Sequence, residues 1–533
     1  MEKKNQIDKR DFWLYFLIGI SVLLGIGFRF FFLENKTFWA DETCTLLRIS
    51  GFFETDFLKQ LSYDQIINAS ALRQFQVPNA QNGITGTLKG LATEEPQLSP
   101  LYFLLLHPWM QWLGSSVAVI RTLTAIATVL LFPALYWLGL ELFQAALPTW
   151  VAIGLVAVSP LQIGFAHEAR PYAFWLVTFV LANAAFLRAM RLNTSRSWLI
   201  YTLTIPLNIY TYLLTGLLFV AHTLYVLWHE RFRFSRLTRN YGLSLVVGMV
   251  LSAGWLLVVF YNLISIPQLK GAHETISFLA IIRRVVLGGI RNIFFDLNNE
   301  QVPDVQMFGI DPSPPLSLIL FAFFLYFSYI FWKYAPRKSS VLMVILIGVS
   351  LLPLILSGRY LPRYLITTYL LVQLVFAYGL SNRVHFALRQ RQQLFWRVVL
   401  AGFFSLSIFA CVISVQKQTA WIKHGFREVE IARFINQYPN TLVVTDASTC
   451  VVLMLTNYLE PSVQLQAEPV CGICTADAAT FKRPDRLPEI PANFANVFLY
   501  APSPKLLEGL SKNHTVTLID NLNFGISQLY RVN

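Results

Sequence analysis

Long uninterrupted runs of apolar residues constrain this chain more than any other feature of its sequence. Many runs extend for about 18 to 25 positions, which lets an α-helix cross a hydrocarbon core of about 30 Å. Only 13% of the 533 residues are charged, whereas water-soluble proteins average about 25%. These features exclude a soluble enzyme and predict a polytopic α-helical membrane protein. A transmembrane β-barrel would show alternating polarity in segments of about ten residues, and no such alternation appears.

The formal net charge of +13 comes largely from Lys and Arg residues that lie between the apolar runs. This placement does not favour nucleic acid as a partner, and the positive-inside rule makes the basic clusters cytoplasmic. The clusters are Lys3, Lys4, Lys9 and Arg10; Arg188, Arg191 and Arg196; Arg231, Arg233, Arg236 and Arg239; Lys333, Arg337 and Lys338; and Arg383, Arg389, Arg391 and Arg397.

The positions of these clusters predict about eleven spans, because an even number of crossings must separate neighbouring cytoplasmic clusters. Five apolar runs lie between Arg10 and Arg188, so one of them does not cross. We assign the run 101–113 as a re-entrant or interfacial helix, since it would reach only about 20 Å. The N-terminus is then inside and the C-terminus outside. The predicted spans lie near 12–33, 117–142, 149–165, 172–187, 198–213, 214–229, 241–263, 315–332, 340–357, 364–381 and 398–416.

This topology predicts two domains. A transmembrane domain, 1–417, includes a long extracytoplasmic first loop, 34–116, and a helix in the membrane interface over 276–295. A small soluble α/β domain, 418–533, lies outside the membrane. Its expected helices span 425–438 and 504–512, and its expected strands span 441–445, 496–500, 515–519 and 527–531.

An adjacent pair of carboxylates, Asp41 and Glu42, opens the first extracytoplasmic loop, beyond Arg29 at the outer end of the first span. One carboxylate could act as a general base while the other orients an acceptor or binds a cation. The alternative is that Asp41 only caps the N-terminus of a helix that runs through Leu47.

A second group of candidates lies in the predicted outer turn between two spans, and it comprises His167, Glu168, Arg170 and Tyr172. Charges near hydrocarbon cost about 2.5 to 3.5 kcal/mol on insertion scales and usually find partners. Glu168 and Arg170 therefore either pair with each other, or Arg170 binds a phosphate while Glu168 holds an acceptor or a sugar hydroxyl.

A third group, again predicted to be outside, comprises Arg359, Tyr360, Arg363 and Tyr364. The guanidinium fork of arginine fits phosphate well, so these arginines are candidates for a phosphate ligand. The alternative is contact with the phosphates of bulk lipid. The acids of 94–102 rank second, because the prolines there favour a fixed turn.

The cysteines on the outer side favour disulfides over zinc binding or redox catalysis, because an extracytoplasmic compartment is oxidising. They are Cys44, Cys450, Cys471 and Cys474. No P-loop, HExxH or GxSxG pattern is present, so nucleotide-driven pumping and common hydrolase chemistries lack support.

Three motifs, in the right order along most of the membrane part, resemble those of the GT-C glycosyltransferases, in the branch of protein O-mannosyltransferases and aminoarabinose (lipid A) transferases. Where relatives often show Lys-Pro-Pro or His-Pro-Pro before the second helix, this chain has 98–100, Leu-Ser-Pro, which puts a phosphate or acceptor contact there in doubt. The matching segments are Arg29 and Leu33 with 37–42, which resemble the first-loop Asp-Glu motif; 167–172, which resembles the "EARxY" turn; and 363–364, which resembles the late "RY" motif.

The resemblance implies a membrane enzyme of the GT-C fold that moves a sugar from a polyprenyl-phosphate carrier to a lipid, glycan or protein acceptor on the extracytoplasmic face. It implies no metal, and we expect no cofactor. In a bacterium the enzyme would lie in the cytoplasmic membrane with its active site facing the periplasm. The implied catalytic residues are Asp41 as general base, Glu42 as its partner, and Glu168; the implied substrate-binding residues are Arg29, His167, Arg170, Tyr172, Arg359, Tyr360, Arg363 and Tyr364.

The chemistry of such a donor agrees with these residue types. A polyprenyl phosphate leaves as a stable anion, so the transition state needs a base for the acceptor and cations for the phosphate. Direct attack with a single base predicts inversion at the sugar carbon. Two alternatives stay open: a multi-span lipid or sugar transporter or flippase, although the sequence shows no internal repeat, and a non-catalytic relative that binds a lipid-linked sugar.

Overall fold

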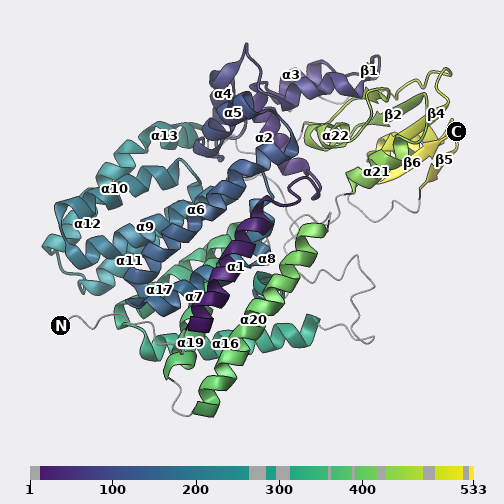
Figure 1. Ribbon diagram of the computed structural model, residues 1–533. Coiled ribbons are helices and arrows are strands. Elements are labelled where there is room, and N and C mark those ends of the chain that lie inside the picture. The colour runs from purple at the N-terminus through teal and green to yellow at the C-terminus, as the bar shows by residue number, and fades with distance from the viewer. Residues whose placement is uncertain are drawn as a thin grey trace.

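The computed structural model combines a bundle of long helices with an outer layer that contains a six-stranded sheet (Figure 1). It describes residues 12–262, 284–295, 313–357, 362–386, 390–417, 427–471, 487–519 and 527–533.

The bundle contains helices at every predicted span. Seven helices in the described ranges are long and apolar enough to cross a membrane, or up to nine if each of two bent pairs counts as one span. Two further helices on predicted spans, α10 and α11, have only 15 and 14 residues. The helices are α1 (Phe12–Phe30), α6 (Val117–Phe143), α7 (Ala146–Ala157), α8 (Pro160–Ala166), α9 (Tyr172–Leu192), α10 (Ser195–Ile209), α11 (Gly216–His229), α12 (Arg236–Leu251), α13 (Ala253–Asn262), α16 (Ser313–Tyr334), α17 (Arg337–Ser350), α18 (Leu352–Ser357), α19 (Ile366–Phe386) and α20 (Gln390–Gln416).

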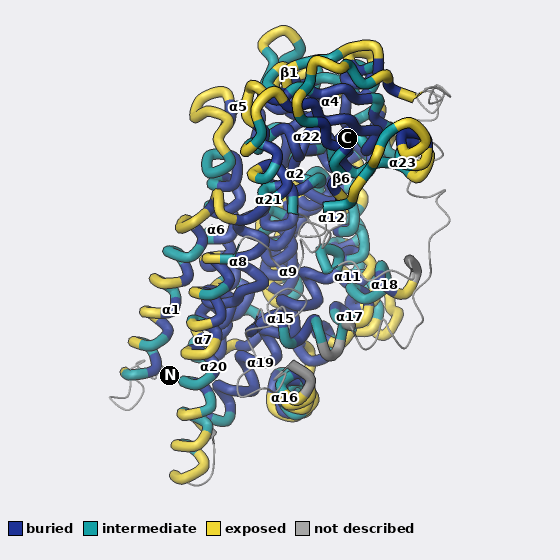
Figure 2. Tube along the Cα trace, turned by 90° about the vertical axis from the view of Figure 1, so that its right-hand side faces the viewer, coloured by how far each residue is buried: buried dark blue, intermediate teal, exposed yellow. Residues whose placement is uncertain are grey.

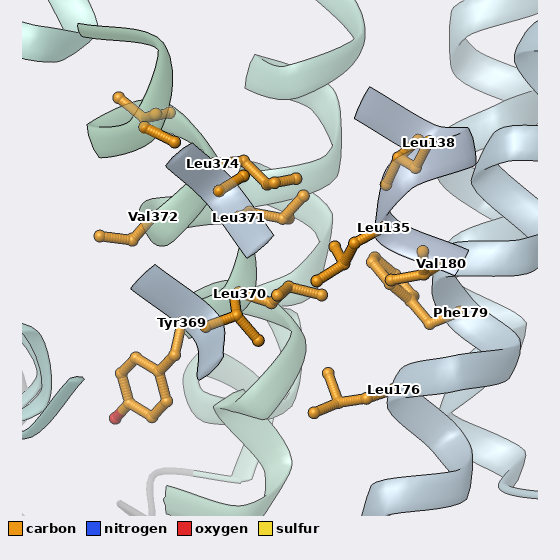
Figure 3. Close-up of a cluster of buried hydrophobic side chains, with 14 of the residues drawn as sticks. Leu135, Leu138, Leu176, Phe179, Val180, Tyr369, Leu370, Leu371, Val372 and Leu374 are labelled. Carbon is orange, nitrogen blue, oxygen red and sulfur yellow. The ribbon is translucent and has the colours of Figure 1, made fainter. Parts of the chain in front are cut away.

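The fraction of buried residues differs strongly between these helices. Helix α19 is buried almost throughout, and its Leu370, Leu371 and Leu374 pack near Leu135 of α6 and Leu176 of α9 (Figure 3). Helices α1 and α20 instead expose many large apolar side chains (Figure 2). In a soluble protein such faces would be unfavourable, but lipid tails satisfy them. The chain is therefore a polytopic α-helical membrane protein, as its apolar runs predict.

Two of the spans are bent rather than straight. Helices α7 and α8 meet at 60°, and α12 and α13 meet at 67°. At the first bend, Pro160 opens α8, and the Oγ of Ser159 donates a hydrogen bond to the carbonyl of Ile293. Helix α8 thereby leads the chain directly into the turn that carries His167 and Arg170.

The segment predicted to lie in the interface is partly outside the described residues, and most residues from 289 to 295 are buried. A short π-helix, η5 (Arg284–Gly289), leads into α15 (Ile290–Phe294). Phe294 packs against Phe376 of α19 and Phe403 of α20. This end of the segment therefore lies among the helices of the bundle instead of on the membrane surface.

The first loop folds over the end of the bundle at which α1 ends and α6 begins. Its last helix coincides with residues 101–113, which the sequence assigns to a helix that does not cross the membrane. That helix, α5, is not among the candidate spans. The elements of the loop are α2 (Ala40–Ser50), α3 (Glu54–Lys59), β1 (Ile66–Asn68), the 3₁₀ helix η1 (Ala69–Gln76), α4 (Gly83–Glu94) and α5 (Leu101–Leu113).

The C-terminal domain, 427–533 among the described residues, is α/β as predicted, but the first loop completes its sheet. The strand order is β1-β3-β2-β4-β6-β5, and β1 of the first loop pairs antiparallel with β3, with Ile66 opposite Gln466. Strand β2 is parallel to β3 and β4, and all its residues are buried. The elements are α21 (Glu428–Ile435), β2 (Thr441–Thr445), α22 (Thr449–Thr456), β3 (Gln464–Ala467), β4 (Asn496–Tyr500), α23 (Pro504–Ser511), β5 (Val516–Leu518) and β6 (Leu529–Val532).

Candidate active site

The candidate site lies where the N-terminus of α2 meets the turn 167–171 and the start of α19. Trp39 is the N-cap of α2, and the carboxylate of Glu42 accepts a hydrogen bond from the backbone N–H of Trp39 at 3.4 Å. Asp41 therefore lies in the first helical turn and is not the cap residue. Two acids in the first turn also suit the positive end of the helix dipole.

Glu42 is fully buried and forms a closed ion pair with Arg121 of α6. Arg121 donates through Nε to Oε1 at 2.8 Å and through Nη2 to Oε2 at 2.7 Å. The backbone N–H of Ala169 donates to the same Oε1 at 2.7 Å. Glu42 thus holds three elements together through contacts inside the protein.

Arg121 also binds the chain that precedes α2. Its two terminal nitrogens donate to the backbone carbonyls of Leu33, Lys36 and Thr37 at 2.6 to 3.1 Å. A guanidinium offers five donors in a fixed fork, so one side chain can fix both a carboxylate and a bend of backbone. Arg121 therefore anchors the segment that carries Asp41 to the membrane bundle.

Asp41 forms an open ion pair with Arg363. The Oδ2 of Asp41 lies 3.0 Å from Nη1 of Arg363, and each side chain is 27% exposed. Arg363 also lies over the rings of Trp39 and Tyr364, at 5.6 and 5.7 Å from the ring centres. Unlike Glu42, this pair is accessible to a ligand.

Arg170 completes the group from the turn before α9. Its Nη1 donates to the backbone carbonyl of Asp41 at 3.1 Å and to the hydroxyl of Thr45 at 2.8 Å, and its guanidinium lies over the ring of Tyr172 at 5.9 Å. Burial lowers the pKa of Arg170, but Tyr172, Asp41 and the nearby Glu95 raise it more, so the net shift is upward and the side chain stays charged.

Other predicted site residues lie around this group. His167 and Glu168 are buried, and Nε2 of His167 lies 2.9 Å from the carbonyl of Phe28 at the end of α1. Tyr172 begins α9 and is buried against Phe165. Tyr364 lies in the short helix η6 (Pro362–Leu365) beside Arg363.

Arg29 lies away from this group. It is fully buried, and its guanidinium donates to the carbonyls of Val156 and Ala157 at the C-terminal end of α7, at 3.1 and 2.6 Å. A cation suits the negative end of a helix dipole, so these contacts tie α1 to α7. Arg359 and Tyr360 lie outside the described residues.

A second buried cluster of charged residues lies further along α2 than Asp41. Its acids ranked second among the candidates from the sequence. Arg48 of α2 pairs with Glu94, and its Nε lies 3.1 Å from Oε2 of Glu95. Burial raises the pKa of Glu95, although Arg48 opposes the shift. Burial lowers the pKa of Arg48, but Glu94 and Glu95 raise it more. The cluster fixes the end of α4 against α2.

Sequence reasoning also missed Arg121, although its setting offered a signal. Arg121 is the one charged residue in the first half of α6, an otherwise apolar span. A lone charge within a span is by default a candidate for function. In the described ranges, no group of three or more His, Cys, Asp or Glu residues could hold a metal ion, and the expectation of a metal-free site stays a prediction.

An apolar pocket opens beside Tyr364, between α9, α11, α17 and α19. The cavity itself is small, with a volume of about 20 Å³. Most of the lining is aliphatic or aromatic, which suits a hydrocarbon ligand. The lining includes Trp175, Phe179, Leu218, Leu346, Val349 and Tyr364.

Two solved structures match the chain over nearly its full length. The crystal structure of ArnT from Cupriavidus metallidurans in the apo state matches with a TM-score of 0.55, 12% identity and coverage of 98% of each chain. The structure of the same protein bound to undecaprenyl phosphate matches with a TM-score of 0.52, 11% identity and the same coverage. The chain has the GT-C fold of ArnT. At this identity the likeness establishes the fold alone, and it confirms the fold that the motifs imply.

A weaker match is the oligosaccharyltransferase of Archaeoglobus fulgidus, tethered with an acceptor peptide. Its TM-score is 0.46 at 13% identity, with coverage of 88% of this chain and 64% of that one. No protein-family model matches the sequence, and no curated protein matches it.

Proposed function

We propose that the chain is an integral-membrane glycosyltransferase that moves a sugar from a polyprenyl-phosphate carrier to an acceptor on the extracytoplasmic face. The observation that carries the proposal is the open Asp41–Arg363 pair, joined by Arg170 and placed beside an apolar pocket, within a GT-C fold. A base, two cations and an apolar surface for the lipid are the parts that such a donor requires. The ArnT structure bound to undecaprenyl phosphate supports this class of donor.

The two arginines suit the phosphate of the donor. Arg363 is partly exposed and Arg170 is charged, so a phosphate at the opening can contact both guanidinium groups. On binding, the phosphate takes the place of Asp41 as the partner of Arg363. The apolar residues around Tyr364 then contact the first part of the isoprenoid chain.

Release from Arg363 frees the carboxylate of Asp41 to act as the base. Asp41 accepts the proton of the acceptor hydroxyl as its oxygen bonds to the sugar carbon, while the bond from that carbon to the phosphate oxygen breaks. The electron pair leaves with the phosphate, which the arginines hold. One direct displacement inverts the sugar carbon, so a product with retained configuration would reject this mechanism.

The remaining predicted residues take supporting roles in the proposal. Glu42 holds α2 in place through Arg121 rather than exchanging protons, because its carboxylate is buried and fully bonded. His167, Glu168 and Tyr172 shape the wall around Arg170. The proposed contacts of Arg359 and Tyr360 with the donor phosphate stay predictions.

Two features support an extracytoplasmic site. The disulfide Cys44–Cys450 joins the first loop to the C-terminal domain, and disulfides persist in oxidising compartments. The positions of the basic clusters along the sequence also favour an extracytoplasmic Asp41 by the positive-inside rule. The proposed division is a membrane domain, 1–417, and an extracytoplasmic domain, 418–533, whose sheet borrows β1 from the first loop. A bacterial cytoplasmic membrane with a periplasmic site fits this arrangement.

The variant Asp41→Asn tests the proposal. It keeps the size of the side chain but removes the base, so turnover of a radiolabelled polyprenyl-phosphate sugar by the purified protein in lipid should fall by about 10² to 10⁴ fold. Donor binding should persist, because the arginines remain. Asp64→Asn, an exposed carboxylate in the same loop, is the matched control.

Unchanged turnover in Asp41→Asn would overturn the assignment of the base. Movement of the labelled donor across the bilayer without sugar transfer would favour the transporter or flippase alternative. Donor binding without turnover or transport by the unmodified protein would favour a non-catalytic relative.

A further inference from the structure

The C-terminal domain directly contacts the segment 38–44, which carries Asp41. Helix α22 packs beside α2, the helix that begins next to Asp41 (Figures 1 and 2). The disulfide Cys44–Cys450 joins the two helices, with a Cα–Cα distance of 5.4 Å. Cys44 lies three positions after Asp41, so the bridge fixes the backbone one helical turn beyond the carboxylate.

A second contact fixes the backbone before Asp41. The N–H of Phe38 donates a hydrogen bond to the hydroxyl of Tyr458, two residues after α22, at 2.6 Å. Phe38 lies three positions before Asp41 and is buried. A buried backbone N–H without an acceptor costs about 1 to 3 kcal/mol, so this hydroxyl determines where the segment can lie.

Tyr458 lies among charged groups from both domains. Burial raises its pKa to about 12, and the charges of Arg121, Glu42 and Glu428 act on it. The phenol therefore stays protonated at neutral pH. It connects the domain to the same segment that Arg121 and Glu42 anchor from the membrane side.

Other contacts join the first loop to the domain without passing near Asp41. Strand β1 pairs with β3, and the side-chain amide of Gln76 donates to the carbonyl of Leu453 at 2.9 Å. The domain should therefore stay docked when Tyr458 or the disulfide is altered. This separation allows the local effect on Asp41 to be measured.

We infer that Tyr458 and the Cys44–Cys450 bridge are positioning elements of the active site, which hold the segment 38–44 so that the carboxylate of Asp41 faces the donor. The inference rests on the proposed function, because it takes Asp41 as the base. A displacement of about 1 Å at a reacting group can cost about 10² fold in rate. The C-terminal domain thereby contributes to the chemistry without touching the substrate.

The decisive variant is Tyr458→Phe, which removes only the hydroxyl. We expect kcat for transfer from a polyprenyl-phosphate sugar to fall about 10-fold or more, while KM for the donor changes less than about twofold, because Arg170 and Arg363 are intact. The pair of changes Cys44→Ala and Cys450→Ala should lower kcat in the same way. Tyr530→Phe is the control, since the Tyr530 hydroxyl bonds only Gln528 among the described residues, at the surface of the same domain.

Thermal unfolding of each variant separates positioning from general stability. Tyr458→Phe should unfold within a few degrees of Tyr530→Phe. The inference is overturned if Tyr458→Phe and the cysteine pair keep the kcat of the unmodified protein while Asp41→Asn is inactive. It is also overturned if their loss lies in KM, or only in the fraction of folded protein. Full activity of Asp41→Asn would instead overturn the proposed function, and the inference with it.

Discussion

Two neighbouring acids, Asp41 and Glu42, have opposite environments. Glu42 points into the protein and meets Arg121, whereas Asp41 points to the opening and meets Arg363 at a partly exposed position. The first turn of a helix separates successive side chains by about 100°, so adjacent residues face different partners. One carboxylate is therefore structural, and the other is open to a ligand, as the proposed base must be.

The variant Glu42→Gln should therefore destabilise the protein rather than only slow it. It removes the carboxylate that is paired with the buried Arg121, and breaking a buried pair costs about 3 to 5 kcal/mol. We expect a clear fall in the unfolding temperature in detergent, with Asp41→Asn staying close to the unmodified protein. Equal unfolding temperatures for Glu42→Gln and the unmodified protein would contradict this division of roles.

The sequence singled out most residues of the candidate site but did not separate the arginines that lie in it from those that lie elsewhere. Arg29 and Arg121 both stand near the outer ends of apolar spans, and their local sequences do not reveal a helix end or a carboxylate as partner. Those partners come from α7 and α2, which are distant in sequence. Asp41, Arg170 and Arg363 could be grouped only through motif resemblance, because the contacts between them are made by tertiary packing.

At the level of elements, close packing of α1 on α7 depends on a glycine. A Cβ at Gly25 would lie 2.4 Å from the carbonyl oxygen of Ala157, the same atom that accepts a hydrogen bond from Arg29. Small residues at such positions let helix backbones approach closely within membranes. The carbonyl oxygen of Ala157 thus takes part both in the close packing of the two helices and in the binding of the buried Arg29.

The variant Gly25→Ala should separate α1 from α7 and weaken the Arg29 contact. Overpacking of this kind costs about 1 to 3 kcal/mol, so the unfolding temperature should fall. Gly19→Ala on the same helix is the matched control, because its Cβ would meet nothing within 4 Å. A similar unfolding temperature for the two variants would show that the helices adjust freely.

Bends and short helices were not predictable from apolar runs. The sequence predicts continuous spans near 149–165 and 241–263, yet each of the two observed helices breaks at a serine, Ser159 or Ser252. Hydropathy measures how strongly a segment prefers lipid, but it does not depend on whether the helix axis is straight or bent. The strands β1 and β3 were missed as well, since their pairing joins segments nearly 400 positions apart.

At the level of the whole molecule, the apolar runs and the positions of Lys and Arg were enough to predict the fold class. They could not predict that the first loop and the C-terminal domain share one sheet and one disulfide. Such long-range contacts depend on three-dimensional proximity, which a single sequence does not show. The two outer parts, predicted separately, are joined in the structure.

The disulfide between the first loop and the C-terminal domain can be checked directly. Proteolysis of the unreduced protein, followed by mass spectrometry, should yield a peptide that contains Cys44 linked to one that contains Cys450. Reduction should release both, and the buried thiol of Cys411 should label only after unfolding. Recovery of Cys44 as a free thiol, or linked to Cys471, would contradict the arrangement.

The separation of 406 residues between Cys44 and Cys450 has a consequence for how the protein is made. At about 5 to 20 residues per second, a ribosome needs about 20 to 80 s to synthesise that stretch. Cys44 therefore emerges long before its partner exists, and every intervening span must enter the membrane first. The bridge beside Asp41 is thus completed among the last steps of biogenesis, so each copy of the protein acquires its finished site only after the rest of its chain is in place.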